Sequence, residues 1–128
     1  MVDWIEPQGV AAPLGNYTHV VRHGPGRRLI ISGQVGVTPD GEIAEGLEDQ
    51  MRWAMKNLVA CLKAGGMEVG DLVKIVTLCV PEGQVATGRT VRAEVLGEHK
   101  PASTWIEGVK LANPALLFEI EGEAVRED

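Results

Sequence analysis

The sequence predicts an α+β fold in which two helices cover one face of a β-sheet. Residues 46–64 and 84–97 carry apolar side chains at helical spacing, whereas the apolar stretches around them have the composition of strands. In chain order the predicted elements are strand, strand, helix, strand, helix, strand and strand. The chain has 128 residues, a length typical of one domain, so we expect residues 1–128 to fold as a single domain.

The N-terminal part of the chain predicts a β-hairpin. Residues 17–22 and 27–32 suit strands, and the segment 23–26 (HGPG) between them is a strong turn signal. Glycine and proline supply the backbone angles that a chain reversal needs. Residues 1–16 show no periodicity and are rich in proline, glycine and alanine, so we interpret them as an extended lead-in.

The first predicted helix, residues 46–64, has one apolar face. Most of its charged side chains fall on the opposite face. The apolar positions are Leu47, Met51, Ala54, Met55, Leu58, Cys61 and Leu62. A Gly-Gly pair at 65–66 then ends the helix. Residues 84–97 predict a second helix, which Gly88 weakens because glycine has a low helix propensity.

Further strands are predicted in the C-terminal half. Residues 72–80 form a long β-rich run that Pro81 stops, and residues 104–110 form the next strand. The last strand alternates between residues 116 and 125, so that Phe118 and Ile120 share one face. The intervening positions place Glu119, Glu121 and Glu123 together on the other face. A solvated sheet face is the preferred interpretation of this carboxylate row, and enclosure in an oligomer is the alternative.

The run 72–80 predicts self-association. It is apolar at both odd and even positions, with Lys74 as its one charge, and strands buried on both faces have this composition. The two predicted helices cover one face of one sheet, so a second copy is the economical cover for Val73 and Ile75. A monomer avoids this only if the sheet closes into a small barrel.

Composition excludes several classes of protein. The net charge is −6 and no run of Lys or Arg exceeds two, which argues against nucleic acid or an anionic membrane as partner. No apolar run has the length of a membrane span, and the N-terminus lacks the features of a signal peptide, so we expect a cytoplasmic protein. Cys61 and Cys79 lie inside predicted elements and are expected to be core thiols.

The sequence offers no strong catalytic motif. The three histidines, His19, His23 and His99, have no partners at metal-ligand spacing, so no metal site is expected. At Ser32-Gly33 an apolar strand stops on polar residues. A glycine there permits either the close approach of a ligand to the backbone or a β-bulge, and the sequence favours neither.

Several motifs, in order, resemble the RidA family, also called the YjgF or L-PSP endoribonuclease-like family. Each motif is weak alone, but together they cover nearly the whole chain. They are Leu14-Gly15-Asn16-Tyr17, Ile30-Ile31-Ser32-Gly33-Gln34, Gln50 with Asn57-Leu58, Gly70-Asp71-Leu72-Val73-Lys74, Pro101-Ala102-Ser103-Thr104 and Phe118-Glu119-Ile120-Glu121.

The resemblance implies a mixed sheet like that of chorismate mutase and a homotrimer with ligand clefts between neighbouring subunits. Many members hydrolyse enamines and imines to carbonyl compounds and ammonia without a metal or organic cofactor. By position, Tyr17, Ser32, Gly33 and Glu119 match residues that line the family's cleft. Glu119 matches the carboxylate that places or activates a water, and so it is the candidate catalytic residue.

The sequence departs from the family at two cleft positions. Deaminase members carry an Arg that clamps the substrate carboxylate, and Ser103 occupies this position here. The family's Cys two residues later is Trp105. This makes the chain a divergent member. Arg22, Arg89 and Arg92 are other sources of positive charge, but the sequence does not place them at the cleft.

Two classes of function therefore stay open. The first is an enamine or imine deaminase of altered specificity. In it Glu119 positions water, the backbone at Ser32-Gly33 and the side chain of Ser103 contact the substrate, and Tyr17 and Trp105 shape the pocket. The second is a non-catalytic member that binds a small metabolite at the same cleft. A ribonuclease is the least favoured interpretation, because the chain is acidic and shows no basic groove.

Overall fold

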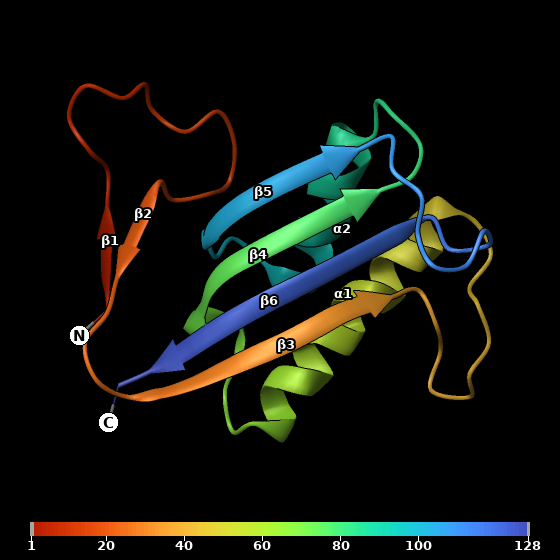
Figure 1. Ribbon diagram of the computed structural model, residues 1–128, viewed down its shortest axis with the longest axis horizontal. Helices are drawn as coiled ribbons and strands as arrows, with labels where there is room; N and C mark the ends of the chain where they lie inside the picture. The colour runs from red at the N-terminus through yellow and green to blue at the C-terminus, as the bar shows by residue number, and fades with distance from the viewer. Residues whose placement is uncertain (1, 128) are drawn as a thin grey trace.

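The computed structural model describes residues 2–127 and shows an α+β fold (Figure 1). Its elements are β1 (Asp3–Ile5), β2 (Val20–Arg22), β3 (Arg27–Val35), α1 (Leu47–Ala64), β4 (Leu72–Cys79), α2 (Val85–Leu96), β5 (Ala102–Glu107) and β6 (Phe118–Arg126), with a 3-10 turn at Val69–Asp71. From β2 onward the order is the predicted one. No helix within residues 2–127 is long and apolar enough to cross a membrane.

The main sheet is mixed and has the strand order β3-β6-β4-β5. Strands β4 and β5 run parallel, and β6 pairs antiparallel with both β3 and β4. Helix α2 supplies the crossover that a parallel pair requires. Both helices lie behind this sheet in Figure 1, so residues 2–127 leave its other face uncovered.

The core lies between the sheet and the two helices. The predicted apolar face of α1 is confirmed, with Met51, Leu58 and Leu62 fully buried, whereas Cys61 at its margin is half-buried. Phe118 and Ile120 of β6 pack against it from the sheet. Fully burying a side chain of this size contributes about 1.5–3 kcal/mol. The layer therefore holds α1 firmly under β6.

The predicted hairpin between residues 17–22 and 27–32 is wrong. Strand β2 pairs with β1, opposing Val21 to Trp4, and makes a separate two-stranded sheet. Strand β3 pairs with β6 instead. The segment between β2 and β3 follows the C-terminal strand, because the Gly24 N–H donates to Glu127 Oε2 at 2.5 Å. Figure 1 shows β1 and β2 standing apart from the main sheet.

The predicted exposure of Ile75 on the uncovered sheet face is also wrong. Ile75 is 1% exposed and belongs to the core. A β-bulge shifts the register between Leu72 and Lys74, so Leu72 and Ile75 both point inward although they are three residues apart. Beyond the bulge the alternation is regular, and Lys74, Val76 and Leu78 face outward.

The predicted strand 104–110 begins and ends earlier in the structure. It is β5, Ala102–Glu107, and Gly108 ends it with a φ of 72°. Glycine adopts this left-handed angle without strain. The earlier start places Ser103 inside the strand, where its register with Ile75 of β4 is fixed.

Candidate ligand cavity

A cavity of about 260 Å³ lies between α2, the start of β5 and the loop 15–17. Of the predicted site residues, it brings together Tyr17, Ser103 and Trp105. Its lining does not include Ser32, Gly33 or Glu119. Its lining is Gly15, Asn16, Tyr17, Met55, Thr77, Val85, Gly88, Arg89, Arg92, Ser103 and Trp105. The mixture of hydroxyls, guanidinium groups and apolar surface is typical of a site for a small polar ligand.

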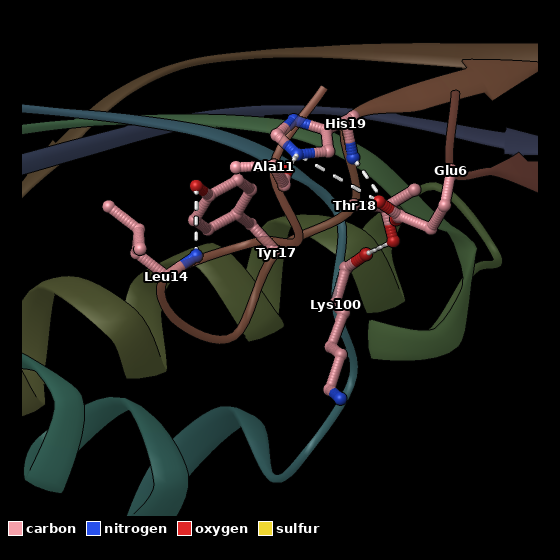
Figure 2. A network of polar contacts seen from close by, with 7 residues as sticks. All are labelled: Glu6, Ala11, Leu14, Tyr17, Thr18, His19 and Lys100. Carbon is pink, nitrogen blue, oxygen red and sulfur yellow. Dashed lines mark hydrogen bonds and ion pairs between the residues drawn. The ribbon is translucent and has the colours of Figure 1, made fainter. Parts of the chain in front are cut away.

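The loop 15–17 is held against β5 by Thr18. The Thr18 N–H donates to the Pro101 carbonyl at 3.2 Å. Its hydroxyl donates to the Lys100 carbonyl at 2.7 Å, and the side chain is buried (Figure 2). Residues 17–19, predicted as strand, therefore form a loop docked just before β5. This docking puts Tyr17 at the mouth of the cavity.

The orientation of Tyr17 is fixed by local contacts. Its hydroxyl accepts the Leu14 N–H at 3.1 Å, and its ring meets His19 edge-on with centroids 5.5 Å apart. One His19 ring nitrogen lies 2.8 Å from the Ala11 carbonyl (Figure 2). The loop is thus folded back on itself, and Tyr17 is held within it.

Trp105 forms the apolar wall of the cavity and explains Gly88. A Cβ at position 88 would lie 2.3 Å from the Trp105 ring. Glycine at this position lets the six-membered ring of the indole approach the α2 backbone closely, at the expense of helix propensity. The ring also contacts Phe118, at 6.1 Å between centroids. Trp105 therefore occupies the helix side of the sheet.

Two hydroxyls line the sheet side of the cavity. Thr77 pairs with Trp105 across β4 and β5, and Ser103 pairs with Ile75 two residues earlier. Ile75 and Thr77 are both buried, so these positions face the helices. Neither the Thr77 nor the Ser103 hydroxyl makes a hydrogen bond to the described residues 2–127. Both hydroxyls are therefore available to hydrogen-bond a ligand.

Arg89 and Arg92 supply the positive charge. They lie one turn apart on α2, and both line the cavity. Arg89 donates to the Leu14 carbonyl at 3.2 Å, and Arg92 donates to the Asn16 carbonyl at 2.6 Å. Burial lowers the pKa of Arg92 from its usual value, but a guanidinium keeps its charge at neutral pH.

Glu119, Ser32 and Gly33 form a second group on the opposite face of the sheet. Phe118 is buried on the helix side, so the next residue, Glu119, points away from the helices. A Cβ at Gly33 would lie 1.7 Å from Glu119 Oε2, so this carboxylate crosses directly over Gly33. Ser32 beside it is exposed.

The β-bulge predicted as one interpretation of Ser32-Gly33 is confirmed, whereas the close approach of a ligand to this backbone stays a prediction. The pairing of β3 with β6 shifts register between Ile31 and Gln34, which is a β-bulge at these residues. The missing Cβ of Gly33 also admits a close neighbour, which within residues 2–127 is the side chain of Glu119. The β-bulge and the missing Cβ thus both allow the Glu119 side chain to contact Gly33.

Within residues 2–127 the cysteines and acidic residues form neither a disulfide nor a metal cluster. Cys61 and Cys79 are both free thiols. Burial, with a smaller effect of Glu107, raises the pKa of Cys79 to about 11, so this thiol stays protonated at neutral pH. Within the described part of the chain, no three His, Cys, Asp or Glu side chains converge at a spacing that would hold a metal ion.

The sequence profile of the family described as "Endoribonuclease L-PSP" matches residues 9–126. The chain belongs to this family. It is the family, also called RidA or YjgF, that the sequence motifs resemble, and the mixed sheet with two helices on one face is its fold.

Similar proteins agree with this membership. A Rid-family protein of unknown function, YyfB from Yersinia pestis, has a crystal structure that superposes with a TM-score of 0.86 at 28% identity, covering 98% of both chains. The 2-iminobutanoate/2-iminopropanoate deaminase of Salmonella typhimurium is 32% identical over 95% of this chain and 96% of its own. The crystal structure of Escherichia coli TdcF with bound serine has a TM-score of 0.73 at 30% identity, over 98% of this chain and 99% of that one.

The cavity of this L-PSP family protein contains residues that the sequence analysis did not place at a site. Met55 and Thr77 were assigned only to a helix face and a strand, because neither belongs to a recognisable motif. Arg89 and Arg92 were named as sources of charge without a location. Their i, i+3 spacing put them on one side of a helix, but only the docking of the loop 15–17 shows that this side faces a cavity.

Proposed function

We propose that this protein hydrolyses enamines or imines of small metabolites to carbonyl compounds and ammonia. The reaction takes place at clefts between the subunits of a homotrimer. The cavity with Tyr17, Ser103 and Trp105 binds the substrate, and Glu119 acts on the attacking water. The cytoplasmic location expected from the sequence stays a prediction.

One observation supports an active site shared between two subunits. Trp105 lies on the helix side of the sheet and Glu119 on the uncovered side, so a single chain cannot direct both at one small ligand. In a cyclic trimer the uncovered face of one copy meets a different surface of its neighbour. If that surface is the cavity mouth formed by α2, the start of β5 and the loop 15–17, Glu119 of one copy reaches the cavity of the next. That face carries both apolar and acidic side chains, and Ile30 on it is 74% exposed.

The chemistry requires few groups. Water adds to the electrophilic carbon of the C=N bond while the Glu119 carboxylate accepts its proton. Glu119 returns this proton to the nitrogen, which gives a tetrahedral carbinolamine with one hydroxyl and one amino group. Glu119 then transfers the hydroxyl proton to the amino group as the C–N bond breaks, so ammonia leaves and a carbonyl remains. An enamine enters this sequence after its carbon is protonated to give the imine. Positioning and one proton shuttle therefore suffice, without a cofactor.

The relatives support the reaction class. The Salmonella typhimurium protein is named as a deaminase of 2-iminobutanoate and 2-iminopropanoate, and Escherichia coli TdcF has been crystallised with serine. Both indicate small amino-acid-derived ligands for this fold. The net charge of −6 favours a small molecule over RNA as partner, despite the ribonuclease name of the family.

Ser103 and Trp105 favour a second candidate, a protein that binds a small metabolite without turnover. Ser103 supplies a neutral hydroxyl where the resemblance leads us to expect a charged clamp, and the Trp105 indole narrows the cavity. Binding of a metabolite with no acceleration of imine hydrolysis would favour this candidate.

The test measures ammonia release from imines that an amino-acid oxidase generates from a panel of amino acids. We expect the wild-type protein to accelerate hydrolysis of at least one imine. Glu119→Gln keeps the shape of the side chain but cannot accept the proton, so its rate should fall about 100-fold or more.

Glu121→Gln is the matched control. Glu121 lies two residues further along the same face of β6 and is exposed, but it does not lie over Gly33. Its rate should stay near that of the wild type. Equal rates for wild type and Glu119→Gln across the whole panel would rule out the proposed role of Glu119.

A further inference from the structure

Arg89 and Arg92 differ from most other arginines of this chain in what they contact. Four arginines pair with carboxylates: Arg22 with Asp3, Arg28 with Glu123, Arg52 with Asp49 and Glu94, and Arg126 with Asp71. Within residues 2–127, Arg89 and Arg92 bond only backbone carbonyls and have no acidic partner. A carbonyl satisfies a donor but does not neutralise the charge.

Both guanidinium groups keep donors available. Each has five N–H donors, and the recorded bonds of Arg89 and Arg92 all use Nη2. The donors on Nε and Nη1 are therefore not used by the described residues. Because both side chains line the cavity, this surplus of charge and donors suits an anionic group placed inside it.

The rest of the lining restricts the ligand to a small one. Met55, Val85 and Trp105 are apolar, and they leave a cavity of about 260 Å³ beside the hydroxyls of Thr77 and Ser103. A large side chain would have to displace the indole, which is packed against Gly88. A carboxylate attached to a short carbon chain matches this combination.

Building on the proposed hydrolysis of imines, we infer that Arg89 and Arg92 of α2 bind the carboxylate of the substrate. The charge that selects acidic substrates thus comes from α2, while Ser103 on β5 contributes only a hydroxyl. Neutral imines lack the group that pairs with the guanidiniums. The two arginines are therefore the specificity-determining residues for 2-imino acids over neutral imines.

A substitution at Gly15 offers an independent way to displace the guanidinium of Arg89. A Cβ at position 15 would lie 2.7 Å from Arg89 Nη2 and 3.2 Å from its Cζ. Gly15→Ala therefore pushes the guanidinium from its place without removing its charge. The atoms that must move are the end of a flexible side chain, so the fold should be little affected.

The experiment is isothermal titration calorimetry with 2-oxobutanoate and its neutral amide, 2-oxobutanamide, as non-reacting probes. Wild type should bind the carboxylate more tightly than the amide. Arg89→Gln and Arg92→Gln should each weaken 2-oxobutanoate binding about 10- to 100-fold and leave amide binding unchanged. Gly15→Ala should also weaken the binding of 2-oxobutanoate.

Arg22→Gln is the control, because Arg22 lies in β2 and pairs with Asp3. It should bind both probes as the wild type does. Arg92 also donates to the Asn16 and His99 carbonyls and so supports the loop 15–17. The Arg92→Gln result is therefore counted only when the circular dichroism of the variant is native. Arg89→Gln and Gly15→Ala decide the matter in any case, because Arg89 is exposed at the rim.

Equal affinity of wild type for the two probes, or wild-type affinity in Arg89→Gln and Gly15→Ala, would overturn the inference. Failure to bind 2-oxobutanoate at all would do the same. The two proposals fail separately. Arginine-dependent carboxylate binding without imine hydrolysis refutes the enzyme but not the anion site. Imine hydrolysis that is indifferent to both arginines refutes the anion site but not the enzyme.

Discussion

Gly33 is the residue at which strand β3 admits the Glu119 carboxylate. An added Cβ would lie 1.7 Å from Glu119 Oε2 and 2.6 Å from its Cδ. Since the obstructed atoms belong to the end of a side chain, the carboxylate would move while the strand stays in place. The position of Glu119 is thus coupled to a residue that has no functional group of its own.

Gly33→Ala should therefore lower the rate of imine hydrolysis about 100-fold, the scale of loss expected from a misplacement of about 1 Å. The thermal midpoint should shift little. Gly70→Ala is the control, because nothing lies within 4 Å of a Cβ at position 70. An unchanged rate in Gly33→Ala, with the native fold retained, would mean that Glu119 does not act from this position.

At the scale of elements, Glu107 joins the end of β5 to the start of α2, the two elements that wall the cavity. Its carboxylate accepts the N–H groups of Gln84 at 2.7 Å and Gly83 at 3.0 Å. These two backbone bonds, that of Gln84 first, lower the pKa of Glu107 from its usual value. The bonds hold α2 at the distance that the cavity requires.

Glu107→Gln should lower the thermal midpoint at neutral pH, because a neutral amide accepts these bonds more weakly. A lowered folded-state pKa means that the contribution is complete above the unfolded value, about 4.3, and is lost as the pH falls through the folded value. The difference from wild type should therefore be constant above about pH 5.5 and shrink below pH 4. Glu98→Gln, on the exposed segment after α2, serves as the control. A difference that grows on acidification would contradict the capping role.

Elements with strong periodicity could be predicted from the sequence, and pairing partners could not. The apolar face of α1 and the alternation of β6 repeat over several turns or residue pairs, so local sequence determines them. The hairpin was wrong because the segment 23–26 indicates a turn without saying which strand β2 joins. Strand β1 has three residues, too few to show a pattern.

The candidate site was predictable only in part, because local motifs identify residues but do not show how strands and loops pack together. Of the residues that the motifs assigned to one cleft, Tyr17, Ser103 and Trp105 line one cavity. Ser32 and Gly33, assigned with them, lie instead beside Glu119. The separation of Glu119 from the cavity was not foreseen, because the face on which Trp105 lies depends on the register of β5 against β4. Register and loop docking arise from tertiary packing, which no local stretch encodes.

For the whole molecule, the uncovered sheet face is the surface on which a second copy is proposed to pack. Val76 lies on this face opposite Glu121, while its neighbour Ile75 is in the core. Val76→Glu adds a second carboxylate beside Glu121, so it should abolish self-association without unfolding the chain. Ile75→Asp buries a charge and should unfold it.

Sedimentation and circular dichroism separate these outcomes. Wild type should sediment as a trimer and Val76→Glu as a folded monomer, whereas Val76→Thr, which keeps the size, should remain associated. A trimer in Val76→Glu would show that subunits meet elsewhere.

The central claim is that the cavity of one copy works with Glu119 of another, and co-expression of two inactive variants tests it directly. Glu119→Gln keeps an intact cavity, and Ser103→Phe fills the cavity but keeps Glu119. In mixed assemblies formed at equal amounts, about a quarter of the clefts join two intact halves, so about a quarter of the wild-type hydrolysis should return. If the co-expressed variants assemble together but stay as inactive as each alone, the site lies within one chain and the account is wrong.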